Sequence, residues 1–224
     1  MNKCIFGVTG GIGTGKSHCL KAMEEIFRRL DIPFHCIEVD KTRRHILRVS
    51  NEETHKKARQ LLAEALDLNS ESPDFFIDLL DLGSKVFADE EKMIIFKETI
   101  NPFIKKEIIR QNDSEGVTAV EWAMLVEDGF LPLVKGNILI LTCANDVQLG
   151  RLKRSQDMSD DQLLQRVDFY RSLDKKRLEI AQNQGKMVKV FDTTKDPGRD
   201  SYECLVQEII EKIGYKNGKN IYKK

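Results

Sequence analysis

The residues with the clearest chemical meaning lie near the N-terminus of the chain. Gly10-Gly11-Ile12-Gly13-Thr14-Gly15-Lys16-Ser17 matches the pattern G-x-x-x-x-G-K-[ST] in full. Glycines let the backbone turn its amide N–H groups inward, so such a loop can cradle an anion at the start of a helix. We expect residues 11–15 to bind phosphate, Lys16 to reach the β- and γ-phosphates, and the Ser17 hydroxyl to coordinate Mg²⁺. The predicted ligands are ATP and Mg²⁺.

Asp40 is the first candidate for acid–base chemistry. We predict that it ends the second strand, where a carboxylate can accept or orient the proton of an acceptor hydroxyl. Arg44 follows closely and can pair with an anionic group of the acceptor. Two ordinary roles stay open. Asp40 could cap a helix that starts at Lys41, and the arginine could lie on a solvated helix face.

A basic stretch in the second half of the chain could cover the phosphates. Its arginines are Arg151, Arg154, Arg166 and Arg171. A guanidinium pairs with two phosphate oxygens and can neutralise the charge that develops during phosphoryl transfer. By its position we expect Arg154 to be the catalytic arginine, although surface charge offset by nearby aspartates is the ordinary alternative.

Two glutamates flank the third predicted strand. Glu121 could hold a metal-bound water, and Glu127 could contact the acceptor. Either could instead be a surface or capping carboxylate.

The elements that must position these residues alternate between short apolar strands and helices. Strands are predicted at Cys4–Val8, Phe34–Val39, Val117–Trp122, Ile138–Cys143 and Met187–Phe191. This alternation predicts an α/β fold with a doubly wound, five-stranded parallel sheet. Ligands of such sheets bind beyond the carboxyl ends of the strands, where Thr9, Asp40, Glu121 and Cys143 should lie.

The same pattern divides the chain into four parts. Residues 1–40, 117–144 and 184–215 are expected to form the nucleotide-binding core. Residues 41–116 read as a helical acceptor domain, residues 145–183 as a lid region and residues 216–224 as a flexible basic tail.

Specific residues predict where several helices begin or change. Asp89 should cap one helix, and Ser159 with Gln162 should form a capping box for another. Pro102 should kink or restart the helix it lies in. A separate apolar helical face is expected to begin at Phe75 and Phe76.

Composition narrows the class of protein. The 224 residues contain 36 basic and 36 acidic side chains, so the formal net charge is zero and favours no nucleic-acid partner. The chain has no apolar run near the roughly 20 residues of a membrane span, and no signal peptide is recognisable. The five scattered cysteines favour neither disulfides nor zinc, so we expect a cytoplasmic protein. The sequence leaves the oligomeric state open.

The phosphate loop alone does not name the acceptor, because GTPases, motors and small-molecule kinases share it. No N-K-x-D motif for reading guanine is present. Two helical inserts suit a kinase, which must exclude water from the transferred phosphoryl group. We therefore expect a small-molecule kinase that uses ATP.

Several segments together resemble the dephospho-CoA kinase family over roughly residues 4–195. Val8-Thr9-Gly10-Gly11-Ile12-Gly13 resembles its opening, and Asp40-Lys41-Thr42-Arg43-Arg44 its D-x-x-x-R segment. Further similar segments are Val86-Phe87 with Ile100-Asn101-Pro102, Ala123–Glu127, and Arg151–Arg154 with Met158, Ser159 and Arg166.

The resemblance implies phosphorylation of the ribose 3′-hydroxyl of dephospho-CoA. It implies that Asp40 is the catalytic carboxylate, that Arg44 and Glu127 serve the acceptor and that Arg154 belongs to the lid. The chain departs from the family pattern at Glu38, Leu79, Asn101, Ala123 and Tyr170. Two alternatives therefore stay open: a nucleoside or nucleotide kinase, and a nucleotide-binding regulatory protein that has lost catalysis.

Overall fold

The computed structural model describes residues 3–68, 74–86, 89–113, 115–155 and 159–215. The chain forms two compact units. The first combines Met1–Ile37 with Ser114–Lys224, and the second is Glu38–Asp113. The predicted tail, residues 216–224, lies outside the described residues.

The first unit is built on a five-stranded parallel sheet, which confirms the predicted fold class. Its strands are β1 (Lys3–Thr9), β2 (Phe34–Glu38), β3 (Gly116–Glu121), β4 (Asn137–Thr142) and β5 (Met187–Asp192). They lie in the order β2-β3-β1-β4-β5. The central strand β1 therefore pairs with β3 on one side and β4 on the other.

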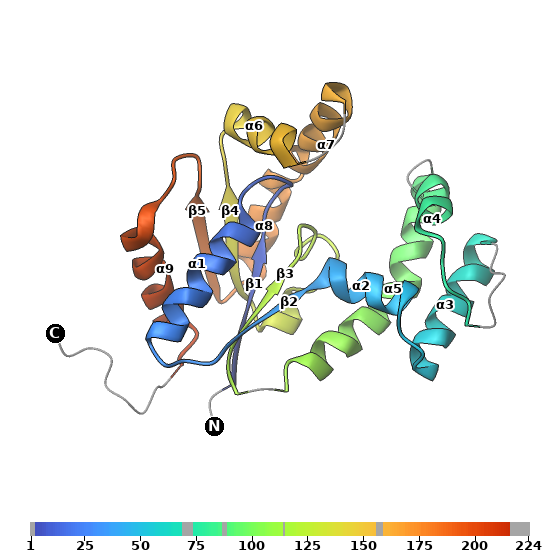
Figure 1. The fold of residues 1–224 in the computed structure, drawn as a ribbon, viewed down its shortest axis with the longest axis horizontal. Coiled ribbons are helices and arrows are strands. Elements are labelled where there is room, and N and C mark those ends of the chain that lie inside the picture. The colour runs from blue at the N-terminus through green and yellow to red at the C-terminus, as the bar shows by residue number, and fades with distance from the viewer. Residues whose placement is uncertain (1–2, 69–73, 87–88, 114, 156–158, 216–224) are drawn as a thin grey trace. The chain divides into compact units, whose positions relative to one another are not determined.

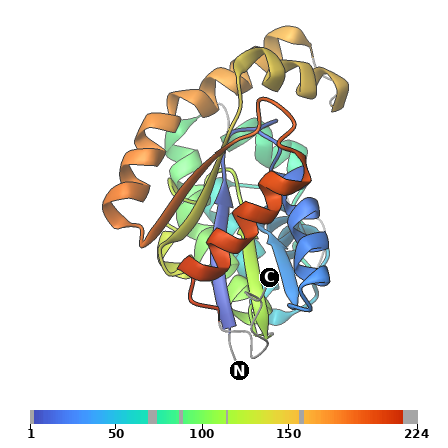
Figure 2. The same cartoon turned by 90° about the vertical axis from the view of Figure 1, so that its left-hand side faces the viewer.

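Two helices cover one face of this sheet. They are α1 (Lys16–Arg29) and α9 (Gly198–Lys212), which lie side by side in Figure 1 and again in Figure 2. Their apolar faces and the sheet form one buried core, which includes Phe6, Val8, Met23, Phe27, Val206 and Ile209. A strand buried on both faces needs an almost continuous apolar run, and this explains the run that begins at Cys4.

Three helices follow β4 in sequence: α6 (Asn145–Ser155), α7 (Asp160–Ser172) and α8 (Asp174–Gln184). The capping box at the start of α7 is confirmed. The Ser159 hydroxyl accepts a hydrogen bond from the Gln162 backbone N–H, and the Gln162 side chain accepts one from the Ser159 backbone N–H. Leu152 of α6 packs with Leu163 and Val167 of α7 in a separate small core.

The second unit consists of helices in its described residues: α2 (Val39–Arg48), α3 (Glu53–Leu66), α4 (Leu79–Val86) and α5 (Glu90–Gln111). Asp89 caps α5 as predicted, since its Oδ1 accepts hydrogen bonds from the N–H groups of Glu91 and Lys92. The expectation of a restart at Pro102 was wrong, because α5 continues through it as one helix.

Two predicted boundaries need correction. The strand expected to reach Val39 ends at Glu38, and Val39 begins α2 as a fully buried residue, so Asp40 lies in the first helical turn and is neither a strand end nor an N-cap. Phe75 and Phe76 lie before α4 rather than in it. Phe75 has a φ of 55° and the Phe76 ring lies 4.7 Å from the Arg59 guanidinium, so local packing overrides the helical pattern here.

In these described ranges, no helix combines the length and the apolar character that crossing a bilayer requires.

Candidate active site

The loop between β1 and α1 has the geometry of an anion cradle. Gly15 precedes α1 in the left-handed conformation with a φ of 88°, which a residue with a side chain rarely adopts. Gly10 has a φ of 140°, and a Cβ there would collide with the Leu141 carbonyl oxygen. Because the N-cap residue is a glycine, it has no side chain that could cap the start of α1. The N-cap residue therefore does not compete for the first-turn N–H groups, and the positive end of the helix dipole favours phosphate there.

Lys16 is folded into this loop. Its Nζ donates hydrogen bonds to the carbonyl oxygens of Gly10 and Gly11, both at 3.1 Å. The same Nζ lies 3.7 Å from Oε1 of Glu121, and only 11% and 13% of the two side chains are exposed. Glu121 reaches this position because it ends β3 and pairs in register with Val8 of β1. The sheet thus brings together two residues that the sequence had singled out separately.

Ser17 follows Lys16 in the first turn of α1 and is exposed. Among the residues that the structure describes, no group of three or more His, Cys, Asp or Glu side chains could hold a metal ion.

Two residues that sequence reasoning did not assign to the site, Gln148 and Thr193, contact the loop, and Arg151 of the predicted basic stretch contacts Thr193. Gln148 donates to the Ile12 carbonyl oxygen at 2.5 Å, and Thr193 donates to the Thr14 carbonyl oxygen at 2.8 Å. Arg151 donates to both the hydroxyl and the carbonyl oxygen of Thr193, at 3.0 and 2.6 Å. Thr193 follows β5 at the carboxyl edge of the sheet, and that position is a signal that could have identified it. Gln148 carries no such signal in the sequence.

Glu127 lies in a buried ion pair. Its Oε1 is 2.8 Å from Nε of Arg177, and the two side chains are 7% and 1% exposed. Arg177 also donates to Oδ1 of Asp174 at 2.7 Å and to the carbonyl oxygen of Ala123 at 3.3 Å. Burial raises the pKa of Glu127, and the charge of Arg177 opposes this rise. The pair ties α8 to the segment that follows β3.

That segment is also tied to the start of the phosphate loop. The Thr9 hydroxyl donates to the same Ala123 carbonyl oxygen at 3.1 Å, and Thr9 ends β1 directly before Gly10. A chain of contacts therefore runs from Glu127 through Arg177 and Ala123 to the phosphate loop.

The arginines of the predicted lid region differ in their surroundings. Arg154 is exposed on α6, and its Nε donates to the Gly150 carbonyl oxygen of its own helix at 3.0 Å. Arg166 is exposed on α7. Arg171 instead donates to the carbonyl oxygen of Cys143 at 3.1 Å, just beyond the carboxyl end of β4.

The acceptor candidates Asp40 and Arg44 belong to the helical unit. The Asp40 side chain is 60% exposed and accepts a hydrogen bond from Arg43 at 2.7 Å. Arg44 is exposed on the same helix. Both side chains are therefore accessible to a ligand.

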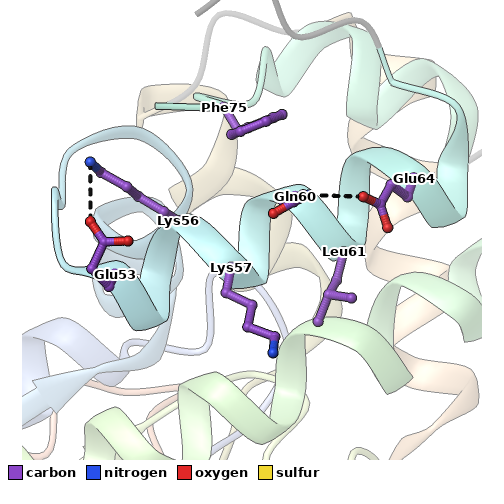
Figure 3. Close-up of a pocket in the computed structure, with 7 residues that line it drawn as sticks. All are labelled: Glu53, Lys56, Lys57, Gln60, Leu61, Glu64 and Phe75. Atoms are coloured by element: carbon purple, nitrogen blue, oxygen red, sulfur yellow. Dashed lines mark hydrogen bonds and ion pairs between the residues drawn. The ribbon is translucent and has the colours of Figure 1, made fainter. Parts of the chain in front are cut away.

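A hollow of about 700 Å³ lies along α3 in the same unit, and Figure 3 shows its lining. Several of its polar side chains make contacts with neighbouring side chains. Lys56 is 3.4 Å from Glu53 and 3.0 Å from Asp74, and Gln60 donates to Glu64 at 3.1 Å. We assign no ligand to it.

The sequence of this chain is similar to those of known proteins. A family model described as dephospho-CoA kinase matches residues 4–186. A dephospho-CoA kinase of Bacillus cereus is 29% identical over 192 residues, which cover 82% of this chain and 90% of the relative. The dephospho-CoA kinase of Carboxydothermus hydrogenoformans is 26% identical over 176 residues, covering 77% of this chain and 80% of the relative.

Solved structures agree at the level of the fold. A crystal structure of a Thermus thermophilus protein superposes with a TM-score of 0.63 at 17% identity, covering 94% of this chain and 98% of that one. Dephospho-CoA kinase from Campylobacter jejuni superposes with a TM-score of 0.55 at 19% identity, with coverages of 93% and 96%.

Proposed function

The chain belongs to the dephospho-CoA kinase family, and from this premise we propose that it transfers the γ-phosphoryl group of ATP to the ribose 3′-hydroxyl of dephospho-CoA. The products are coenzyme A and ADP. The observation that carries the proposal is the phosphate loop with Lys16 and Glu121 beside it, within a family match that spans residues 4–186.

The nucleotide side of the reaction is assigned to the loop and its helix. Backbone N–H groups of residues 11–15 bind the phosphates, and the Lys16 ammonium group, which uses two of its three donors on loop carbonyl oxygens, contacts the β- and γ-phosphates. The Ser17 hydroxyl would hold Mg²⁺, which supplies positive charge to the transferring phosphoryl group when it is bound. Glu121 holds Lys16 at the site and would help to hold the water shell of Mg²⁺.

The acceptor side is assigned to Asp40, Arg44 and Glu127. Asp40 accepts the proton of the 3′-hydroxyl as the oxygen attacks, and its exposed carboxylate is suited to this role. Arg44 pairs with an anionic group of the acceptor. Because Glu127 is buried against Arg177, we propose that it serves the acceptor by holding the segment after β3 in place.

Arg154 is assigned to transition-state stabilisation from the lid region, where its exposure leaves it able to turn toward phosphate. Arg154→Gln should lower kcat and leave the Kd for ATP unchanged. Loss of ATP affinity with an unchanged kcat would remove Arg154 from this role.

An ADP-release assay tests the proposal as a whole. Dephospho-CoA should support ADP formation in the presence of ATP and Mg²⁺, whereas a panel of nucleosides and nucleoside monophosphates should not. Turnover with a member of that panel would instead identify a nucleoside or nucleotide kinase. ATP binding without turnover on any acceptor would identify a regulatory protein. We propose a cytoplasmic location, where ATP and Mg²⁺ are available.

A further inference from the structure

A loop that points its N–H groups at phosphate must turn carbonyl oxygens the other way. A buried carbonyl oxygen without a hydrogen-bond donor is costly, so these carbonyl oxygens need donors on the side of the loop away from phosphate. Here the donors are the side chains of Gln148, in α6, and Thr193, which follows β5.

Gln148 supports the tip of the loop. Only 2% of this residue is exposed, and its side-chain amide donates to the Ile12 carbonyl oxygen at 2.5 Å. The Ile12 side chain packs against the small core that Leu152 shares with α7. Leu152 also lies against Gly13, where an added Cβ would come within 2.9 Å of its Cγ. The tip therefore rests on α6 through one hydrogen bond and close apolar packing.

Thr193 supports the other end of the loop. It is 2% exposed, and its Oγ1 lies 2.8 Å from the Thr14 carbonyl oxygen and 3.1 Å from that of Thr142. Its hydroxyl has a single proton to donate. The Thr142 carbonyl already accepts the Thr193 backbone N–H at 2.9 Å, and Arg151 donates to the Thr193 hydroxyl oxygen. The proton is therefore directed to Thr14.

These two contacts differ from those made by Lys16 inside the loop. Lys16 belongs to the loop and is itself assigned to phosphate, whereas Gln148 and Thr193 come from α6 and from the residue after β5 and donate to loop carbonyl oxygens without an assigned contact to nucleotide. We propose that Gln148 and Thr193 are positioning residues that preorganise the loop and so set the affinity for nucleotides that carry a β-phosphate. This inference rests on the proposed use of ATP.

Two substitutions remove the donors with little change of shape: Thr193→Val and Gln148→Met. Each should raise the Kd for Mg·ATP and Mg·ADP about tenfold, which corresponds to about 1.4 kcal/mol. The KM for ATP should rise in parallel, while the KM for dephospho-CoA stays within about twofold. AMP should bind the variants and the wild type equally well, because it has no β-phosphate for the loop to hold. Calorimetry measures these affinities, and circular dichroism confirms that each variant is folded.

Matched variants make the result specific. Thr193→Ser restores the hydroxyl and should bind ATP as the wild type does, and Gln165→Met makes the same chemical change at an exposed position of α7. The inference is overturned if the Kd for Mg·ADP changes less than twofold in Gln148→Met, if AMP loses affinity equally, or if Thr193→Ser behaves like Thr193→Val. Should Thr193→Val fail to fold, Gln148→Met decides the question. Wild-type protein that binds no ATP would refute the proposed function itself, which separates the two failures.

Discussion

The Lys16 ammonium group lies 3.7 Å from the Glu121 carboxylate at the carboxyl edge of two neighbouring strands. Charges this close and largely shielded from water attract each other more strongly than a surface pair does. Glu121 therefore keeps the lysine in the loop before nucleotide arrives. The Lys16 ammonium group is therefore already positioned for ATP, and less side-chain conformational freedom is lost when the nucleotide binds.

Replacing Lys16 with alanine should weaken ATP binding and reduce turnover by at least about 10²-fold, because a preorganised charge on the transferring phosphates is lost. Calorimetry and steady-state ADP release measure the two effects. Lys21→Ala, an exposed lysine further along α1, is the control and should behave as the wild type. Near-normal turnover in Lys16→Ala would disprove the role of the phosphate loop.

Asp40→Asn should slow the chemical step by about 10²-fold or more, which is the usual scale of acid–base catalysis, and should leave the Kd for ATP unchanged. The substitution keeps the size of the side chain and removes its ability to take a proton. Single-turnover kinetics measure the step directly. Glu53→Gln neutralises a carboxylate whose side chain is 89% exposed and should have no effect. An unchanged rate in Asp40→Asn would exclude this residue as the base.

Glu127→Leu should lower the free energy of unfolding by about 3–5 kcal/mol, because it removes the buried one of the two carboxylates that pair with the Arg177 guanidinium and leaves it only the half-exposed Asp174. Adding Arg177→Met in the same chain should recover a large part of that loss, since a buried ion pair can be replaced by apolar side chains of similar volume. Urea unfolding provides both values. If the single variant loses less than about 1 kcal/mol, then the pair does not stabilise the fold as described.

A pH dependence of stability is expected from His55 in the helical unit. Burial lowers its pKa; Glu52 and Glu107 oppose this, while His45 and Arg110 add to it. The folded state therefore keeps His55 neutral at a pH where the unfolded state, with a pKa of about 6.5, already binds a proton. The contribution of His55 to stability should be present above pH 6.5 and decline as the pH falls from there toward the lower folded pKa.

Urea unfolding at several pH values between 7.5 and 5 tests this expectation. The difference in unfolding free energy between the wild type and His55→Gln should shrink as the pH falls. A constant difference between the wild type and His55→Gln would show that His55 does not titrate differently in the folded and unfolded states.

Much of the sheet could be predicted because local pattern and global fold agree there. The phosphate loop has a unique spacing, and each strand is a short apolar run bounded by turn residues or helices. At Val39 the local sequence preference and the fold disagree. Its β-branched side chain favours a strand, but it is fully buried as the first residue of α2, so tertiary packing overrides the local preference.

The roles of Arg177 and Gln148 could not be predicted from the sequence, for a different reason. Arg177 reads as one more charge in a basic stretch, yet it is 1% exposed and contacts Glu127, which lies 50 positions earlier. Gln148 is an unremarkable helical glutamine until the fold places it behind Ile12. Contacts between residues so distant in sequence depend on how α6 and α8 pack, and no local spacing encodes that packing.

The helical unit leaves the sheet after β2 and returns at β3, and these strands are neighbours in the sheet order. An excursion between adjacent strands can be lengthened, shortened or exchanged without reordering the other three strands or moving the phosphate loop. Asp40 and Arg44, which we assign to the acceptor, lie in this segment, so their surroundings can change while the order of the other strands stays the same. A chimaera in which the equivalent segment of another kinase replaces Glu38–Asp113 should therefore still use ATP as the phosphoryl donor.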